Sequence, residues 1–226
     1  MKSAVIAIED RRFYKHGGID TRGILRAAIN NVTGGSKEGA STITMQVARN
    51  FFLSSERSFK RKINEALLAI KIEHSLSKDK ILELYINQIY LGQRAYGFAA
   101  ASQVYFGKPL EKLNLAETAL LAGLPKAPSS YNPFIHPKRA ITRQREVLHD
   151  MYRYKFIDEA TYQDALKQPL RFKASQQSRD LAADYVGEIV RQAMFELYQD
   201  SIYSSGMKVY TTIIKSSQEA ANNAVI

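Results

Sequence analysis

Residues 59–72 of this chain read FKRKINEALLAIKI. The apolar residues in this stretch recur three or four positions apart, which is the spacing of one face of an α-helix: Phe59, Ile63, Leu67 and Ile70. The charged residues Lys60, Arg61 and Glu65 lie off this stripe. The stretch predicts an amphipathic helix and sets the expectation of a mainly α fold.

Helical patterns continue on both sides of this stretch. Helices are expected over residues 24–32, 43–52, 78–91, 114–123, 137–154, from 158 to before Pro169, 184–198 and 217–225. Asn114 and Glu117 form a capping-box pattern, and Ser77 and Asp158 are good N-caps. Residues 173–179 are polar and predict a linker, and residues 207–213, rich in β-branched and aromatic side chains, predict a strand. We therefore expect one domain over 1–175 and a linker segment over 176–226 that contains a strand.

The composition is that of a globular protein. Of the 226 residues, 45% are hydrophobic and 24% charged, which suits a folded domain with a core. The absence of cysteine excludes disulfides and thiolate metal sites, and the four histidines show no metal-ligand spacing. The sequence contains no run of 18 apolar residues, so it predicts no transmembrane helix. The chain begins within an apolar stretch, so we expect a longer parent protein.

The positive charge is concentrated in the first three quarters of the chain. Residues 1–175 hold 28 Lys and Arg against 16 Asp and Glu, a net charge of +12, whereas residues 176–226 carry −2. A basic surface of this kind indicates an anionic partner: nucleic acid, an anionic membrane or a phosphorylated substrate. A domain that is basic without such a partner remains an alternative.

The first candidate site is residues 9–18, EDRRFYKHGG. Two carboxylates follow an apolar stretch, so Glu9 could emerge from a buried element into a cleft, where burial would raise its pKa and nearby cations would lower it. A catalytic carboxylate and a salt-bridged surface pair both fit this pattern.

Two further clusters could bind phosphate. In residues 39–50, GASTITMQVARN, small and hydroxyl side chains enter a helix and leave backbone N–H groups free for an anion, although an ordinary N-cap explains the same residues. Arg57, Arg61 and Glu65 share a helix face, and Arg49 lies one helix earlier. Several guanidinium groups beside a carboxylate could hold a diphosphate; a solvated charged face is the alternative.

Together these motifs resemble the peptidoglycan glycosyltransferases (glycosyltransferase family 51), found as the N-terminal domain of class A penicillin-binding proteins. The resemblance rests on five motifs in order: Glu-Asp-x-x-Phe-x-x-His-x-Gly at 9–18, Gly-x-Ser-Thr-Ile-Thr-x-Gln at 39–46, Arg-Lys-x-x-Glu at 61–65, Lys-x-x-Ile-Leu-Glu-x-Tyr-x-Asn followed by Gly at 78–92, and Arg143-x-x-x-Val147-Leu148. It covers about residues 1–175.

The resemblance implies a lysozyme-like helical fold with two lobes. It also implies polymerisation of lipid II into β-1,4-linked glycan, with inversion and release of undecaprenyl diphosphate. Glu9 would be the general base on the acceptor hydroxyl, and Glu65 the second essential acid. The substrate-binding residues would be Asp10, Phe13, His16, Ser41, Thr42, Gln46, Arg49, Arg57 and Arg61, with His16 as an orienting group rather than a base.

The resemblance also bears on cofactors, partners and location. It implies no tightly bound cofactor and allows a divalent Mg or Mn ion. The partners would be lipid II, the growing glycan and the outer leaflet of the inner membrane at its periplasmic face, with the anchor and the C-terminal transpeptidase domain absent from this chain. An apolar patch near residues 19–35 is expected to contact the membrane. Two positions depart from the family pattern: Met45 stands where many members have glutamine, and Asn64 where some have lysine.

Three other functions fit the sequence less well. Transpeptidase activity is rejected because the Ser-x-x-Lys pattern occurs three times, with two of the matches overlapping at one helix cap, and no Lys-Thr/Ser-Gly element is present. A lysozyme-like glycosidase would share the fold, but its neutral substrate offers no diphosphate for the arginine cluster. A nucleic-acid-binding module is disfavoured, since no helix-turn-helix or aromatic RNA-binding pattern occurs.

Overall fold

A computed structural model describes residues 1–32, 41–52, 59–173, 183–199, 202 and 207–225. The chain divides into two compact units, Met1–Lys173 and Ala174–Ile226. Most of the predicted linker at 173–179 lies outside the described residues.

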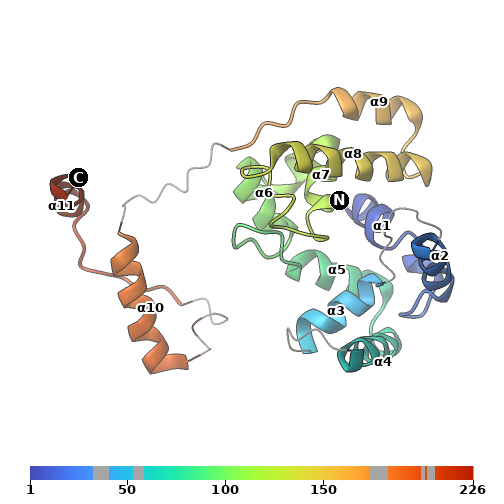
Figure 1. Cartoon of the computed structure of the whole chain (residues 1–226), viewed down its shortest axis with the longest axis horizontal. Coiled ribbons are helices and arrows are strands. Elements are labelled where there is room, and N and C mark those ends of the chain that lie inside the picture. Colours follow the sequence, from blue (N-terminus) through green and yellow to red (C-terminus); the bar gives the residue numbers. More distant parts are fainter. Residues whose placement is uncertain (33–40, 53–58, 174–182, 200–201, 203–206, 226) are drawn as a thin grey trace. The chain divides into compact units, whose positions relative to one another are not determined.

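The first unit is built from helices (Figure 1). Their bounds are α1 Lys2–Glu9, α2 Thr21–Val32, α3 Ile43–Phe52, α4 Phe59–Ser75, α5 Lys78–Gln88, α6 Phe98–Phe106, α7 Leu115–Gly123, α8 Pro137–Arg153 and α9 Glu159–Lys167, with short 3₁₀ turns at Phe13–Lys15 and Leu110–Lys112. The predicted mainly helical fold is confirmed, as is the capping box of Asn114 and Glu117 at the start of α7. Helix α6 was not predicted, because its apolar sequence shows no amphipathic period.

The helices of this unit pack in two groups. Helix α7, buried from Ala116 to Gly123, is packed against α1, α6, α8 and α9. Helices α3, α4 and α5 pack on one another, and α5 also contacts α6. Glu9 ends α1 in the first group, whereas Gln46 and Glu65 lie on α3 and α4 in the second. The two groups therefore each supply part of the predicted site, as expected of a two-lobed helical domain.

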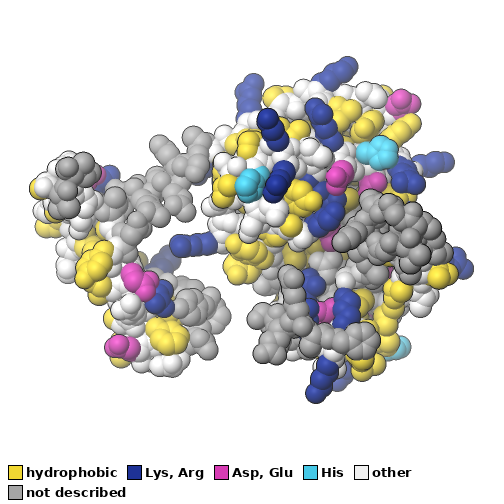
Figure 2. Space-filling model, viewed as in Figure 1, with side chains coloured by type: hydrophobic (Ala, Val, Ile, Leu, Met, Phe, Trp, Pro, Cys, Tyr) yellow, Lys and Arg dark blue, Asp and Glu magenta, His cyan; other side chains and the backbone are white. Residues whose placement is uncertain are grey.

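Helix α4 is amphipathic, but its apolar stripe does not face the core. Ile63, Leu67 and Ile70 are 48%, 61% and 38% exposed, while Glu65 and Ala69 are buried. The packing of α3 against the Glu65–Ala69 face explains this orientation. Hydrophobic side chains are visible on the surface over α4 (Figure 2). Among the described helices, none combines the length and apolarity needed to cross a bilayer.

The second unit contains α10 (Asp184–Tyr198) and α11 (Lys215–Val225), both predicted. The strand predicted over residues 207–213 is wrong, because these residues form no regular secondary structure. A strand needs a neighbouring strand to accept and donate its backbone hydrogen bonds. In the described part of the chain, no neighbouring strand pairs with residues 207–213. The side chains of Val209 and Tyr210 are exposed, so β propensity alone did not create a strand.

Candidate active site

Glu9 stands where α1 ends. The helix buries Ala4, Val5, Ile6 and Ala7, so its last residue leaves the core at the C-terminal end. The carboxylate of Glu9 accepts a 2.8 Å hydrogen bond from Nε2 of Gln46, one turn into α3. The predicted base and the predicted motif-two glutamine are therefore in direct contact.

Burial raises the pKa of Glu9 above its ordinary value of 4.5. The hydrogen bond from Gln46 and the positive charges of Arg143, Lys126 and Arg49 act in the opposite direction, without cancelling the effect of burial. A carboxylate with a raised pKa is a stronger base than an exposed one, and this suits it to remove a proton from a hydroxyl group.

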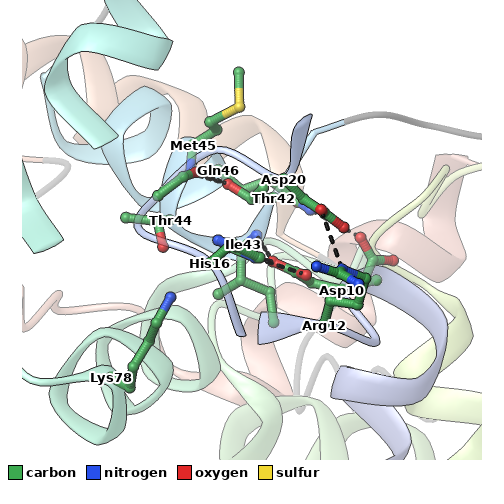
Figure 3. A network of polar contacts seen from close by, with 12 residues as sticks. Asp10, Arg12, His16, Asp20, Thr42, Ile43, Thr44, Met45, Gln46 and Lys78 are labelled. Carbon is green, nitrogen blue, oxygen red and sulfur yellow. Dashed lines mark hydrogen bonds and ion pairs between the residues drawn. The ribbon is translucent and has the colours of Figure 1, made fainter. Parts of the chain in front are cut away.

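Asp10 joins the first motif to the start of α3 (Figure 3). Its carboxylate lies 2.9 Å from Nε2 of His16 and accepts a 3.1 Å bond from the backbone N–H of Ile43. Thr42 caps the same helix by accepting from the N–H of Met45, and its hydroxyl donates to the carbonyl of Gly18 at 2.6 Å. The two adjacent acids, Glu9 and Asp10, are thus held by one turn of α3.

The remaining residues of the first motif also pack inside the protein. Phe13 is fully buried, and Nζ of Lys78 lies 4.4 Å from the centre of its ring. Lys78 in turn pairs with Glu73, which accepts a 2.6 Å bond from the hydroxyl of Thr44. Asp10, Phe13, Thr42 and the His16 side chain are all buried. This geometry favours a role in positioning Glu9, and direct contact of these side chains with substrate stays a prediction.

A second polar cluster surrounds Glu65. Lys62 Nζ lies 2.8 Å from the Glu65 carboxylate and 2.6 Å from Oγ of Ser41, and Nε of Arg61 lies 3.3 Å from the other carboxylate oxygen. Glu65 is only 1% exposed, whereas Lys62 and Arg61 are partly open to solvent. Two cations and a hydroxyl at the start of α3 are therefore fixed around one buried carboxylate, an arrangement suited to an anionic group.

The structure brings together most of the predicted site residues. Glu9 and Gln46 form one contact, Ser41, Arg61 and Glu65 form the second cluster, and Arg49 acts electrostatically on Glu9. Arg57 lies outside the described residues.

Three cations were missed by the sequence analysis. Lys62 belongs to the Arg-Lys-x-x-Glu motif and Arg143 to the motif that ends at Leu148, so a signal for both was present. Lys126 follows Pro125 in a turn and carried no signal. Arg143 is buried, donates to the carbonyl of Gly123 and pairs with Glu146.

No group of three or more His, Asp or Glu side chains in the described residues could hold a metal ion. The carboxylates of the site are already paired: Glu9 with Gln46, Asp10 with His16, and Glu65 with Lys62 and Arg61. The described residues therefore do not form a metal site made by protein ligands alone.

Comparison with known proteins supports the resemblance of the motifs. Residues 1–152 match the family described as transglycosylase. The chain is 55% identical over all 226 residues to penicillin-binding protein 1A of Neisseria lactamica, covering 28% of that protein, and 48% identical over 223 residues (98% of this chain) to that of Pseudomonas aeruginosa, covering 27%. The solved structure of penicillin-binding protein 1A from Haemophilus influenzae is similar over 80% of this chain and 24% of that one, at 38% identity and a TM-score of 0.57. The chain thus spans a little over a quarter of the length of these relatives, and the match over residues 1–152 shows that it belongs to the transglycosylase family, the peptidoglycan glycosyltransferases of cell-wall synthesis.

Proposed function

We propose that residues 1–175 polymerise lipid II into β-1,4-linked glycan, with inversion at the anomeric carbon and release of undecaprenyl diphosphate. The observation that carries this proposal is the placement of Glu9, a half-buried carboxylate with a raised pKa, beside α3, which also begins at the cationic cluster of Lys62 and Arg61. One helix thus connects a candidate base with a candidate site for a leaving diphosphate.

In the proposed reaction Glu9 removes the proton from the 4-hydroxyl of the acceptor sugar. The oxygen forms a bond to the anomeric carbon of the donor chain, and the bond from that carbon to the diphosphate oxygen breaks. The electron pair leaves with undecaprenyl diphosphate, and the proton stays on Glu9 until it passes to solvent. General-base catalysis of this kind contributes about 10²–10⁴-fold to a rate.

The cations act on the other side of the reaction. Negative charge accumulates on the diphosphate as the glycosidic bond breaks, so positive groups already in place stabilise the transition state. Lys62, Arg61 and Arg49 would supply this charge, together with Arg57. Glu65 would serve mainly as the buried anion that holds Lys62 and Arg61 in position.

A divalent ion, if used, would depend on the substrate. The described residues offer no complete set of ligands, so Mg or Mn would be held largely by the oxygens of the lipid diphosphate. The chemistry that such an ion supplies is charge neutralisation, which Lys62 and Arg61 already provide in part.

The enzyme would act at the outer face of the cytoplasmic membrane. Ile24 and Leu25 on α2, within the apolar patch predicted at residues 19–35, are 41% and 64% exposed, and the stripe of α4 is exposed as well. Exposed apolar side chains on a basic domain suit an anionic bilayer. Residues 176–226 would lead from this domain to a transpeptidase domain of a longer parent.

The test is incubation of the purified chain with labelled lipid II, with products separated by size, and with Glu9→Gln in parallel. Long glycan from the wild type alone is the expected result. Glycan formation by both proteins would exclude Glu9 as the base. The absence of both product and lipid II binding in the wild type would overturn the proposed function.

A further inference from the structure

The amide of Gln46 has two chemically different ends, and its contacts show which way it faces. The ionised carboxylate of Glu9 can only accept hydrogen bonds, so the group 2.8 Å from it must be the Nε2 amino group of Gln46. The amide oxygen Oε1 therefore points away from Glu9. Gln46 is only 7% exposed, so this oxygen needs a donor within the protein.

The hydroxyl of Tyr85 provides that donor. It lies 3.4 Å from Oε1 of Gln46, and Tyr85 is 1% exposed on α5, which packs against α3. The distance is long for an O–H···O bond, so the contact is weak. The orientation of the amide is decided at Glu9, because the flipped amide would direct its oxygen at the Glu9 carboxylate. The hydroxyl of Tyr85 then holds Oε1 of Gln46 in this orientation.

We propose that Tyr85 is a positioning residue for the reaction: its hydroxyl holds the amide oxygen of Gln46, and the amino group of Gln46 in turn holds the Glu9 carboxylate. The proposal rests on Glu9 as the base of the proposed function. It gives Tyr85, a residue of the fourth motif, a role that passes through Gln46 and does not require contact with substrate.

The effect of Tyr85 can be separated from the other influences on Glu9. The charged or titratable groups that act on Glu9 come from several elements: Arg49 on α3, Tyr85 on α5, Lys126 after α7 and Arg143 on α8. Burial raises the pKa of Tyr85 well above its usual range, so its hydroxyl stays protonated and neutral in the working pH range. Removal of this hydroxyl leaves all three cations in place and removes the hydrogen bond that Gln46 accepts from Tyr85.

The test compares Tyr85→Phe with Tyr105→Phe. Tyr105 is a second buried tyrosine, and its hydroxyl donates to the carbonyl of Leu91, remote from Glu9. In Tyr85→Phe the Gln46 bond, which lowers the pKa of Glu9, is weakened, so the acidic limb of the rate–pH profile should move to higher pH by about half a unit to one unit. Tyr105→Phe should leave the limb in place. A loss of rate that is equal at every pH would overturn the proposal.

Titration of the Glu9 carboxyl by ¹³C NMR gives the same answer without substrate, with Glu9→Gln used to assign the resonance. Tyr85→Phe should raise the titration midpoint in the wild-type background and have no further effect in Gln46→Met. An unchanged midpoint, or a shift that persists in Gln46→Met, would overturn the role of Tyr85. A shift in a protein that makes no glycan would leave the positioning role standing and remove the proposed function instead.

Discussion

The ammonium group of Lys62 lies 2.8 Å from the Glu65 carboxylate, and Glu65 is almost completely buried. A buried carboxylate is costly unless cations compensate it, and here Lys62 and Arg61 both do so. The same Lys62 reaches Ser41 at the start of α3. Glu65 therefore determines where two cations stand, and the role that the family resemblance implies for it requires no proton transfer.

Replacement of Lys62 by methionine tests this arrangement. Lys62→Met keeps most of the length of the side chain and removes its charge, so the affinity for lipid II should fall by roughly tenfold, a modest value because Lys62 is 44% exposed. Binding of labelled lipid II measures the effect. Lys60→Met is the control, since Lys60 is an exposed residue of the same helix. Equal affinity of the two variants would contradict a role for Lys62 in binding the donor.

Glu9→Gln should lower the polymerisation rate by at least about 10²-fold, because glutamine cannot accept the proton of the acceptor hydroxyl. Its size and its neighbour Gln46 are preserved, so the circular dichroism spectrum should not change. Glu111→Gln, at an exposed position remote from the site, is the matched control. A Glu9→Gln variant with normal rates would remove Glu9 from the mechanism.

The raised pKa of Glu9 predicts opposite effects of pH on activity and stability. Activity needs the ionised form, so kcat/KM should increase as the pH rises through a value above 4.5. The folded protein binds this proton more tightly than the unfolded chain, so the stability that Glu9 contributes is present below pH 4.5 and is lost as the pH rises through the raised pKa. At neutral pH, Glu9→Gln should therefore have a larger free energy of unfolding than the wild type, measured by urea denaturation. A less stable variant would show that the cations outweigh burial.

Asp10→Asn tests the junction between the first motif and α3. The substitution removes the charge that faces His16 and weakens the bond to the N–H of Ile43, so the free energy of unfolding should fall by about 2 kcal/mol. Asp158→Asn is the control, because Asp158 caps α9 at an exposed position by accepting from the N–H of Thr161. Its loss should be clearly smaller. If both variants lost the same free energy of unfolding, the burial of Asp10 and its pairing with His16 would contribute no stability beyond that of a helix cap.

The sequence predicted the features that depend on neighbouring residues in the chain, namely helix bounds, helix caps and motif residues. The bounds of α3 and the capping box of α7 follow from periodicity and cap residues, and the motifs indicated Glu9, Gln46 and Glu65. Contacts between distant segments were not predictable in this way: the pairing of Lys62 with Ser41 depends on how α4 lies against α3. The strand at 207–213 failed for the related reason that a strand requires a partner, which propensity cannot supply.

The exposed stripe of α4 gives the last prediction. A soluble domain normally buries such a face, whereas here the packing of Glu65 and Ala69 turns Ile63, Leu67 and Ile70 outward. If this stripe enters the bilayer, Leu67→Asn should reduce binding to anionic liposomes by roughly tenfold or less, since one leucine contributes about 1–2 kcal/mol when it leaves water. Flotation with the liposomes measures the bound fraction.

Ile135→Asn is the control for this experiment, because Ile135 is 63% exposed against 61% for Leu67 but lies before α8, away from the α4 stripe. A general effect of surface hydrophobicity would weaken flotation equally in both variants. Selective loss in Leu67→Asn would instead assign membrane contact to α4. The buried position of Glu65 would then have a second consequence, since the carboxylate that holds Lys62 and Arg61 also fixes the rotation of α4 that presents the stripe to the lipid.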